Sequence, residues 1–333
     1  MSVNVEDKRL MIMHVLRDSQ EPVSSSSITA ILNSQGIQIS ERTVRFYLLA
    51  MDKKGFTHYV EKKGRSLTKL GLDELTKVKA YEKVGFLSAK IDEYSYNMNF
   101  DINRLTGNVL VNITLISQED FKDSIELLSR AFEKGFSMGE LLTIFYPEDN
   151  DTEIEIPEGF IGIGSVCSIT LNGILLSAGI PVTSQFGGLL EIENRKPKRF
   201  VEIIQYSGTS LDPLEIFISS GLTDHTNVCS SGNGIVGASF RHIPSVAADK
   251  AEKIFKKCKK IGLGSVLEMG HPGSPLLEIP VLEGRTGFIV TGGLNAVGLL
   301  AEAGIKLYSK TLSGCVDFKR LFNYRELEKF RTE

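Results

Sequence analysis

The sequence predicts a mixed α+β fold, in which an N-terminal winged helix-turn-helix is followed by an internally duplicated α+β domain. Two observations lead to this prediction. The first 76 residues show helical periodicity followed by a basic hairpin, and the rest of the chain repeats its own pattern at a constant offset. A length of 333 residues leaves room for two or three domains. We therefore expect a winged-helix domain at 1–76, a linker at 77–83 and a duplicated domain at 84–333.

The composition is that of an ordinary water-soluble protein. Hydrophobic residues make up 42% and charged residues 24% of the chain, and the mean hydropathy is −0.01. Charged residues occupy the N-terminal positions where a signal peptide would be apolar, and no apolar run is long enough to span a membrane. We expect a cytoplasmic protein without membrane contacts. The four cysteines show no CxxC spacing, so neither a metal site nor a disulfide framework is predicted.

Charge is unevenly distributed along the chain. Residues 1–83 contain 14 Lys and Arg against 10 Asp and Glu, a net charge of +4, whereas residues 84–333 contain 24 against 31, a net charge of −7. The basic excess is concentrated between residues 42 and 69. A basic N-terminal part on an acidic remainder predicts that the N-terminal part binds an anionic polymer.

The N-terminal part begins with two predicted helices. Apolar residues recur at helical spacing over 6–19, and Pro22 ends this run. A second helix is expected from Ser25, its candidate N-cap, to Gly36. Two helices of this length before a third are the usual start of a winged helix-turn-helix.

A third helix and a basic hairpin complete the pattern. Ser40 is the expected N-cap of a helix over 41–54, in which Val44, Leu48 and Met51 form one apolar stripe. If the stripe packs inward, the opposite face can lie in the major groove of DNA, while a hairpin over 56–70 contacts phosphates. The residues expected to bind double-stranded DNA are Ser40, Arg42, Thr43, Arg45, Phe46, Lys62, Lys63 and Arg65. The alternative is that these are solvated surface charges, but the order of the elements favours DNA binding.

The remainder of the chain is a duplication. With an offset of 125 residues, identities include Gly107 with Gly232, Gly139 with Gly264, Pro147 with Pro272, Gly162 with Gly287, Gly173 with Gly298, and Gly179 with Gly304. Two modules are expected, at about 84–200 and 209–333, with extended segments and a loop over 201–218 between them. Fused modules commonly leave a cleft, and ligands favour such clefts.

Each module is expected to run strand, helix, strand, strand, helix, strand. In the first copy these elements fall at 109–116, 119–135, 141–146, 160–166, 169–178 and 189–193, and in the second at 235–240, 245–260, 265–269, 287–290, 295–303 and 315–318. This order predicts an α+β domain rather than a doubly wound sheet.

No catalytic or nucleotide-binding motif is convincing. The GxGxxG spacing at 232–237 lies inside an expected strand instead of opening a helix, so it does not predict a dinucleotide site. Cys167 could pair with His225, His242 or His271 as nucleophile and base, but nothing in the sequence brings them together. We therefore expect no catalytic residue, no metal and no cofactor.

The segment 289–295, in which a buried strand leads through a turn of small residues to a helix start, is the best candidate for ligand binding. Backbone N–H groups at such a turn attract carboxylates or phosphates, and the corresponding turn of the first copy lies at 164–170. Arg241, after the first strand of the second module, could add positive charge. The alternative, that the glycines only allow close packing, is open at this point.

Several runs of residues are similar to those of a known family. These are GTSLDPLEIF at 208–217, FRHIP at 240–244, TGGLN at 291–295 and EAGI at 302–305. Following a winged helix, they resemble the archaeal nitrogen-regulatory repressor family, NrpR, and the likeness covers nearly the whole chain. The resemblance implies a homodimeric transcriptional repressor of nitrogen-assimilation genes, with a regulatory domain through which 2-oxoglutarate releases the protein from operator DNA. Some members carry two regulatory domains, so a companion regulator of the same family is a further implied partner.

A buried dicarboxylate with a keto group needs hydrogen-bond donors at both ends. We expect one carboxylate at the turn before Asn295 and the other end at the pseudo-equivalent turn or at the loop near residue 209, with Arg241 as the cation. The expected effector-binding residues are Cys167, Ser168, Thr209, Ser210, Arg241, Thr291, Gly292, Gly293 and Asn295. Two other functions are open: an enzyme acting on an oxo acid, fused to a DNA-binding domain, and a pure interaction module for a companion regulator.

Overall fold

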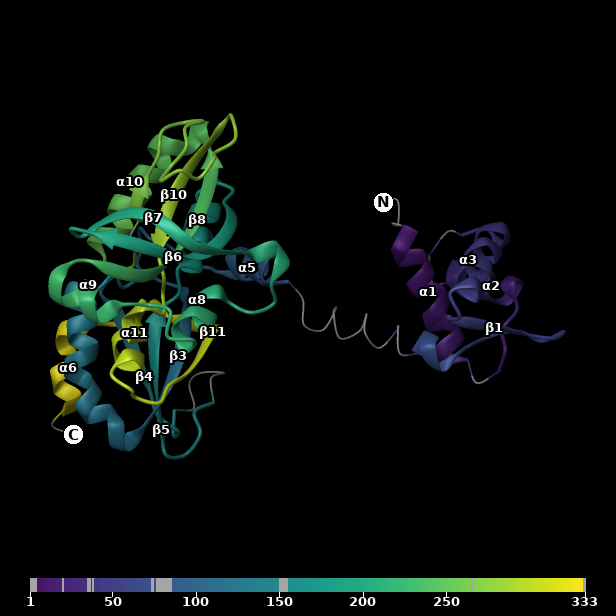
Figure 1. Cartoon of the computed structure of the whole chain (residues 1–333), viewed down its shortest axis with the longest axis horizontal. Helices are drawn as coiled ribbons and strands as arrows, with labels where there is room; N and C mark the ends of the chain where they lie inside the picture. Colours follow the sequence, from purple (N-terminus) through teal and green to yellow (C-terminus); the bar gives the residue numbers. More distant parts are fainter. Residues whose placement is uncertain are drawn as a thin grey trace. The chain divides into compact units, whose positions relative to one another are not determined.

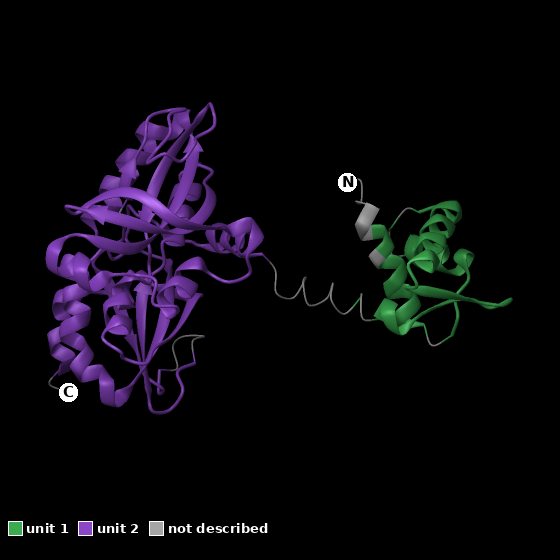
Figure 2. Cartoon of the chain, in the orientation of Figure 1, with its two compact units in different colours: residues 1–85 green, residues 86–333 purple. Residues whose placement is uncertain are grey.

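The structure, a computed structural model, describes residues 5–19, 21–34, 37, 39–72, 75, 86–149, 155–264 and 266–331. It divides the chain into two compact units, Met1–Gly85 and Phe86–Glu333, which we call the head and the body (Figure 2). The predicted linker at 77–83 lies outside the described residues.

The head has the predicted order of elements. Helices α1 (Val5–Asp18), α2 (Ser25–Ser34) and α3 (Glu41–Lys53) precede an antiparallel hairpin of β1 (Thr57–Val60) and β2 (Gly64–Leu67) (Figure 1). This is a winged helix-turn-helix, in which the hairpin is the wing.

Side-chain caps start the second and third helices. Ser40 caps α3 as predicted, because its Oγ accepts a hydrogen bond from the amide of Thr43 at 3.2 Å. At α2 the cap lies one residue earlier than expected: Ser24 Oγ accepts the bond from the amide of Ser27 at 3.1 Å, and Ser25 is the first helical residue. A run of four serines offers several possible caps, so the sequence alone does not fix the position.

The apolar stripe of α3 packs inward. Val44, Leu48 and Met51 are fully buried in a cluster that includes Ile12 of α1 and Ile28 of α2. Burying each such side chain contributes about 1.5 to 3 kcal/mol. The stripe therefore fixes which face of α3 remains outside.

The body is built on two five-stranded antiparallel sheets (Figure 1). The strand orders are β7-β6-β8-β10-β9 and β11-β3-β5-β4-β12. The strands are β3 (Asn108–Ser117), β4 (Leu141–Phe145), β5 (Phe160–Val166), β6 (Thr183–Glu193), β7 (Lys196–Gln205), β8 (Gly234–Pro244), β9 (Val266–Met269), β10 (Arg285–Thr291), β11 (Tyr308–Asp317) and β12 (Phe322–Asn323). The α-helices are α5 (Leu87–Asn97), α6 (Gln118–Lys134), α7 (Ile169–Ser177), α8 (Pro213–Ser219), α9 (His225–Ser231), α10 (Ala248–Lys260) and α11 (Asn295–Glu302).

The predicted duplication is confirmed. The series β3, α6, β4, β5, α7, β6 of the first copy corresponds to β8, α10, β9, β10, α11, β11 of the second. The last strand of each copy, however, joins the sheet of the other copy, since β6 pairs with β8 and β11 pairs with β3. Each sheet therefore contains strands from both copies, and the copies are not separate modules in space.

The buried positions of the long helices α6 and α10 differ by one residue from the constant sequence offset between the copies. The buried residues that correspond are Ile125, Leu128 and Phe132 in α6, and Ala251, Ile254 and Cys258 in α10. A 3-10 turn, η2 (Ser245–Ala247), precedes α10 and has no counterpart before α6. The offset of 125 residues therefore holds for the strands but not for this helix.

The segment between the copies differs from the prediction. Its first part is extended as expected, in β7, but α8 lies where a second extended segment was expected, and α9 follows before the second copy. Asp212 caps α8 by accepting a hydrogen bond from the amide of Leu214 at 2.8 Å, and Pro213 is the first helical residue. Asp followed by Pro is a helix-start signal, so this helix could have been predicted from the sequence.

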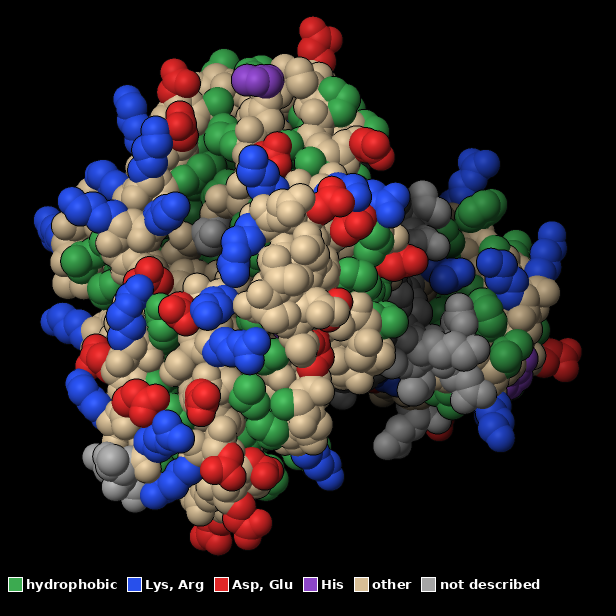
Figure 3. All heavy atoms as spheres, turned by 60° about the vertical axis from the view of Figure 1, so that its left-hand side comes forward, with side chains coloured by type: hydrophobic (Ala, Val, Ile, Leu, Met, Phe, Trp, Pro, Cys, Tyr) green, Lys and Arg blue, Asp and Glu red, His purple; other side chains and the backbone are tan. Residues whose placement is uncertain are grey.

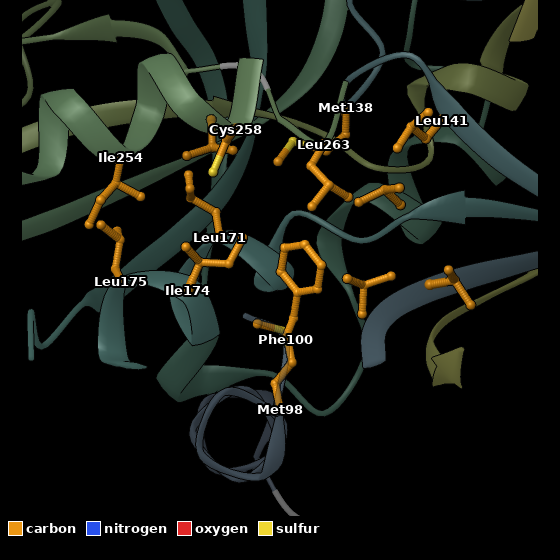
Figure 4. Packing of buried hydrophobic residues seen from close by; sticks show 14 of the residues in the cluster. Met98, Phe100, Met138, Leu141, Leu171, Ile174, Leu175, Ile254, Cys258 and Leu263 are labelled. Carbon is orange, nitrogen blue, oxygen red and sulfur yellow. The ribbon is translucent and has the colours of Figure 1, made fainter. Parts of the chain in front are cut away.

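One hydrophobic core extends across both copies (Figure 4). Leu171 and Ile174 of α7 belong to the same buried cluster as Ile254 and Cys258 of α10. Because α7 comes from the first copy and α10 from the second, the copies meet here in a packed interface. Among the described residues, no helix is both long and apolar enough to cross a membrane.

Candidate functional site

The exposed face of α3 carries the residues predicted to read DNA. The side chains of Arg42 and Arg45 are exposed, and that of Phe46 is 69% exposed. Ser40 and Thr43 hydrogen-bond each other through their hydroxyl groups at 2.8 Å, so both are engaged in the cap of the helix. Capping does not prevent a contact with DNA, but it makes these two residues primarily structural.

Two further features of this face were missed from the sequence. Leu49 lies one helical turn after Phe46 and is 55% exposed, so an apolar pair lies beside the arginines. Arg45 forms an ion pair with Glu41 at 2.7 Å, and the hydrogen bond from Ser25, followed by that from Arg45, lowers the pKa of the Glu41 carboxyl. The i, i+4 spacing of Glu41 and Arg45 signals this pair in the sequence.

The wing presents two of its three predicted cations. Lys62 and Lys63 are exposed at the tip, where Lys62 has a positive φ of 60°. Arg65 is different: its Nε forms an ion pair with Asp52 of α3 at 2.8 Å, its side chain is 17% exposed, and its guanidinium lies over the ring of Tyr59. Arg65 therefore attaches the wing to α3, and the predicted phosphate contacts fall to the two lysines.

In the body, Arg241 is the centre of a buried polar cluster. It lies in β8 opposite Ser184 of β6 and is fully buried. Nη1 donates to the carbonyl of Ser168 at 2.8 Å and to Oδ1 of Asn172 at 2.5 Å, while Nη2 donates to the hydroxyls of Ser168 at 2.6 Å and Ser239 at 3.1 Å. No described carboxylate forms an ion pair with Arg241, and its Nε has no hydrogen-bond partner in this part of the chain. The hydrogen bonds of this buried guanidinium therefore all go to neutral groups.

Burial controls the titratable groups around Arg241. It lowers the pKa of Arg241 itself and raises the pKa of Cys167 to about 12 and that of Asp212 to about 6. Burial also raises the pKa of the Tyr206 hydroxyl well above its usual range. Cys167 is therefore a neutral thiol at physiological pH and not an activated nucleophile.

The turn before α11 is packed with protein atoms. A Cβ added at Gly292 would lie 2.2 Å from Cδ2 of Leu214, and one added at Gly293 would lie 2.4 Å from Nδ2 of Asn112. Thr291 is fully buried. The structure therefore supports the alternative interpretation of these glycines, which is close packing.

Asn295 also has a structural role. Its Oδ1 accepts a hydrogen bond from the amide of Gly237 at 3.0 Å, and its Nδ2 donates to the carbonyls of Gly237 and Phe136, both at 2.8 Å. These bonds use the side chain's amide group to join the start of α11 to β8. The side chain of Asn295 therefore hydrogen-bonds within the protein instead of being available to a ligand.

The loop before α8 lies near the cluster. Thr209 and Ser210 are half-buried, and Thr209 Oγ1 accepts a hydrogen bond from the amide of Leu211 at 3.1 Å. The carbonyl of Thr209 accepts a bond from the amide of Leu87, at the start of α5, at 2.8 Å. Asp212, at the end of the loop, interacts electrostatically with Arg241. The structure thus brings Cys167, Ser168 and Arg241 together with this loop.

A pocket of about 720 Å³ adjoins the cluster. Its polar lining includes Ser88 and Asp92 of α5, Thr183 and Ser184 of β6, Gln205 of β7, and Ser207. Ser184 accepts a hydrogen bond from Nδ2 of Asn172 at 3.0 Å, and Asn172 in turn accepts one from Arg241. Hydrogen bonds therefore lead from the pocket to the buried guanidinium.

Sequence reasoning missed Asn172, Ser184, Tyr206 and Asp212 as members of this site. A signal was present for Asn172, which interrupts an otherwise apolar helix. The duplication supplies a second signal: the counterparts of Ser168, Asn172 and Arg241 in the other copy are Gly293, Val297 and Ile116. The polar cluster combines Ser168 and Asn172 of the first copy with Arg241 of the second, and the pseudo-equivalent place has no polar counterpart.

Comparison with known protein families covers both units. Residues 84–323 match the family described as NrpR regulatory domains NRD1 and 2, and residues 10–75 match the ribonuclease R winged-helix domain. These matches confirm the predicted α+β organisation, with a winged helix followed by a regulatory domain.

Individual relatives give the same result. The global nitrogen regulator NrpRI of Methanosarcina mazei is 37% identical over 321 residues, which are 96% of this chain and 99% of that protein. The global nitrogen regulators NrpR of Methanococcus maripaludis and Methanocaldococcus jannaschii are 30% and 29% identical over 96% and 90% of this chain, and the match spans 55% and 52% of their own lengths. A crystal structure of a nitrogen repressor-like protein from Methanococcus jannaschii is 29% identical, has a TM-score of 0.62, and covers 72% of this chain and 99% of that one.

Proposed function

Because this chain belongs to the NrpR family of nitrogen regulators, we propose that it represses nitrogen-assimilation genes by binding operator DNA through its head, and that 2-oxoglutarate releases it. The family that matches the body and the named relatives are nitrogen regulators. The open questions are therefore which residues bind DNA, which bind the effector, and how the two events are coupled.

The head supports DNA binding by the shape and charge of its outer face. The inward stripe of α3 leaves Arg42, Arg45 and Phe46 outside, where a recognition helix needs donors for base edges and an apolar group for a thymine methyl. The exposed lysines of the wing suit phosphates, which position a protein on DNA without reading sequence.

The observation that carries the effector proposal is the buried Arg241. Burying a guanidinium without an anion is costly, and its present partners are hydroxyl, amide and carbonyl oxygens. A carboxylate of 2-oxoglutarate that replaced Ser168 or Asn172 would form a charge-assisted pair, roughly twice as strong as a neutral hydrogen bond. The site therefore favours an anionic ligand.

The adjoining pocket can hold the rest of the ligand. Its volume of about 720 Å³ is ample for a five-carbon dicarboxylate. Gln205, Ser184 and Ser207 offer amide and hydroxyl donors for a keto oxygen and a second carboxylate. In this assignment, Ser168 and Arg241 bind the effector. The turn at 291–293 and Asn295 do not contact it and have a structural role.

Release from DNA can be transmitted through α5. This helix begins two residues after the head ends, its Leu87 amide is bonded to the Thr209 loop, and its Asp92 lines the pocket. A bound dianion would repel the Asp92 carboxylate and favour a state in which α5 is displaced. The coupling free energy required is typically about 1 to 3 kcal/mol. The exchanged strands make a rotation of one copy against the other a less suitable route.

The protein is proposed to act as a homodimer, because one winged helix covers a half-site and a two-fold axis matches a palindromic operator. A companion regulator of the same family is a further proposed partner.

The experiment that tests the proposal measures DNA binding by the purified protein with 2-oxoglutarate, oxaloacetate or succinate added. We expect 2-oxoglutarate alone to lower affinity for a DNA site obtained by in vitro selection with this protein. Unchanged affinity with all three acids would contradict the effector proposal. Turnover of an oxo acid without DNA would instead indicate an enzyme, and the absence of any ligand-induced rise in melting temperature would indicate an interaction module.

A further inference from the structure

The body carries a basic surface that the proposed function does not use. Helix α10 contains six lysines and two acidic residues, a net charge of +4 on a body whose net charge is −7. All six lysines are exposed; they are Lys250, Lys253, Lys256, Lys257, Lys259 and Lys260, and we call them the lysine face. In the space-filling view, Lys and Arg side chains gather over the part of the body that holds α10 (Figure 3).

Half of the lysine face has no partner within the described parts of the chain. Lys256 pairs with Glu252 at 2.7 Å, Lys257 donates to Asn103 at 2.9 Å, and Lys250 donates to the carbonyl of Ala178 at 2.5 Å. The side-chain ammonium groups of the remaining three form neither ion pairs nor hydrogen bonds with described residues; they are Lys253, Lys259 and Lys260. Three exposed ammonium groups are therefore available to an external anion.

The duplication provides an internal comparison. Helix α6 occupies the corresponding place in the other copy and buries the same kind of apolar stripe, yet it contains three basic and five acidic residues, a net charge of −2. Packing against a sheet therefore does not require lysines on the outer face. The charge of α10 was acquired or retained separately from its role in the core.

We propose that the lysine face contacts the phosphates of duplex DNA beside the site bound by the head, a proposal that rests on DNA binding by the head. Lysines are depleted at the centres of protein–protein interfaces, whereas a row of flexible ammonium groups suits a phosphate backbone. No exposed large hydrophobic residue belongs to α10 itself, and the one beside its start is Val246 of η2.

The covalent connection keeps the body within reach of the flanking DNA. Leu75 is the last described residue of the head and Phe86 the first of the body. At no more than about 3.6 Å per residue, the chain between them spans at most about 40 Å, which is little more than one helical turn of DNA. Whenever the head binds, the lysine face is therefore held at a high effective concentration near neighbouring phosphates.

The test uses the full chain and random-sequence duplexes of about 15 and 45 base pairs, which are about one and a half and four helical turns. One triple variant carries Lys253→Gln, Lys259→Gln and Lys260→Gln. The matched control carries Lys122→Gln, Lys196→Gln and Lys319→Gln, which are also exposed lysines of the body without ion pairs to described residues. A wing variant carries Lys62→Gln and Lys63→Gln.

Each phosphate contact adds about 0.9 to the slope of log affinity against log salt. We expect the α10 variant to have a shallower slope, by up to about 3 per chain, on the long duplex and an unchanged slope on the short one. The control variant should match the wild type on both duplexes. Circular dichroism melting checks that all variants fold equally well.

Equal slopes for the α10 and control variants on the long duplex would overturn the inference. So would an α10 variant that changes oligomeric state in light scattering while its slope stays at the wild-type value, because the face would then bind a second copy. The wing variant tests the proposed function separately: if it binds the short duplex as tightly as the wild type, the head is not the DNA-binding unit.

Discussion

Arg241 is a buried charge whose partners differ from those expected of a buried arginine. Its guanidinium is enclosed by strands and by the N-terminal residue of α7, and its hydrogen bonds go to neutral oxygens. The same position in the other copy is Ile116, which needs no partner. This difference leaves a polar cluster at one of the two pseudo-equivalent places between the copies, and apolar packing around Ile116 at the other.

Replacing Arg241 with Met should abolish the response to 2-oxoglutarate. Removing the buried cation that pairs with a ligand carboxylate typically costs 2 to 5 kcal/mol, so we expect affinity to fall by a factor of about 30 or more in isothermal titration calorimetry. Arg199→Met, at an exposed strand position, is the control and should bind normally. A variant at Arg241 that folds and still binds the ligand at wild-type affinity would place the site elsewhere.

Asp212 should make stability depend on pH in an unusual direction. Its pKa is raised to about 6, so between about pH 4 and pH 6 the folded protein holds a proton that the unfolded chain has lost. The free energy of unfolding contributed by this group therefore falls as pH rises through that window. Asp212→Asn keeps the N-cap of α8 and removes the titration, so the difference in stability between variant and wild type should grow from pH 4 to pH 6 in urea unfolding. A constant difference across the window would contradict the raised pKa.

At the scale of elements, we expect α3 to contact the bases of DNA and the wing to contact its phosphates. The structure leaves Arg42 exposed on the recognition face and Lys62 at the tip of the wing, while Arg65 is used to join the two elements. The Ser40 cap sets where α3 begins, its buried apolar stripe sets which face points outward, and the turn of the hairpin places Lys62 at its tip.

Arg42→Ala should weaken binding to a selected DNA site more than to random duplex, because a base contact contributes about 1 to 3 kcal/mol of discrimination. Lys62→Ala should weaken both by the same factor, since phosphates are the same in every sequence. Fluorescence anisotropy titrations on the two duplexes measure both ratios. Equal losses for the two variants would mean that α3 does not read bases.

The turn between β10 and α11 should prove structural when tested. A Val side chain at Gly293 would meet Asn112 Nδ2, and the carbonyl of Val166 would lie 2.7 Å from its Cβ. Overpacking of this kind typically costs about 1 to 3 kcal/mol or more. We expect Gly293→Val to lower the unfolding midpoint in urea clearly, whereas Gly208→Ala, which would meet no atom within 4 Å, should leave it nearly unchanged. Wild-type stability of Gly293→Val would show that the turn has room for a ligand.

For the whole molecule, the exchange of β6 and β11 turns two copies into one body. Each five-stranded sheet takes strands from both copies, and a common core lies between α7 and α10. A ligand-induced motion is therefore easier at the periphery, in α5 and the loop after β7, than between the copies. This location is also where the chain leaves the body for the head.

The full chain should be a dimer in solution. One head contacts a half-site, and two heads related by a two-fold axis gain affinity on an inverted repeat. Multi-angle light scattering should give about twice the chain mass of 36.7 kDa. A monomer that binds an inverted repeat and a single half-site with the same affinity would contradict this expectation.

Much of the fold could be predicted because its signals are local. The stripe of Val44, Leu48 and Met51, the cap at Ser40 and the constant offset between the copies each depend on residues close in sequence or on a repeated pattern. The family resemblance likewise follows from short runs such as 208–217 and 291–295. These features determine the winged helix, the α+β class and the duplication.

The structural roles of the polar residues can be assigned only from the tertiary structure. Strand exchange depends on pairing between segments about two hundred residues apart, as in the register of Val109 with Val316, and no local pattern specifies which sheet a strand joins. The roles of Arg65 and Arg241 depend in the same way on Asp52 and Asn172, which reach them through folding. A sequence shows which side chains carry charge, but burial and distance determine whether that charge holds the fold together or remains available to a ligand.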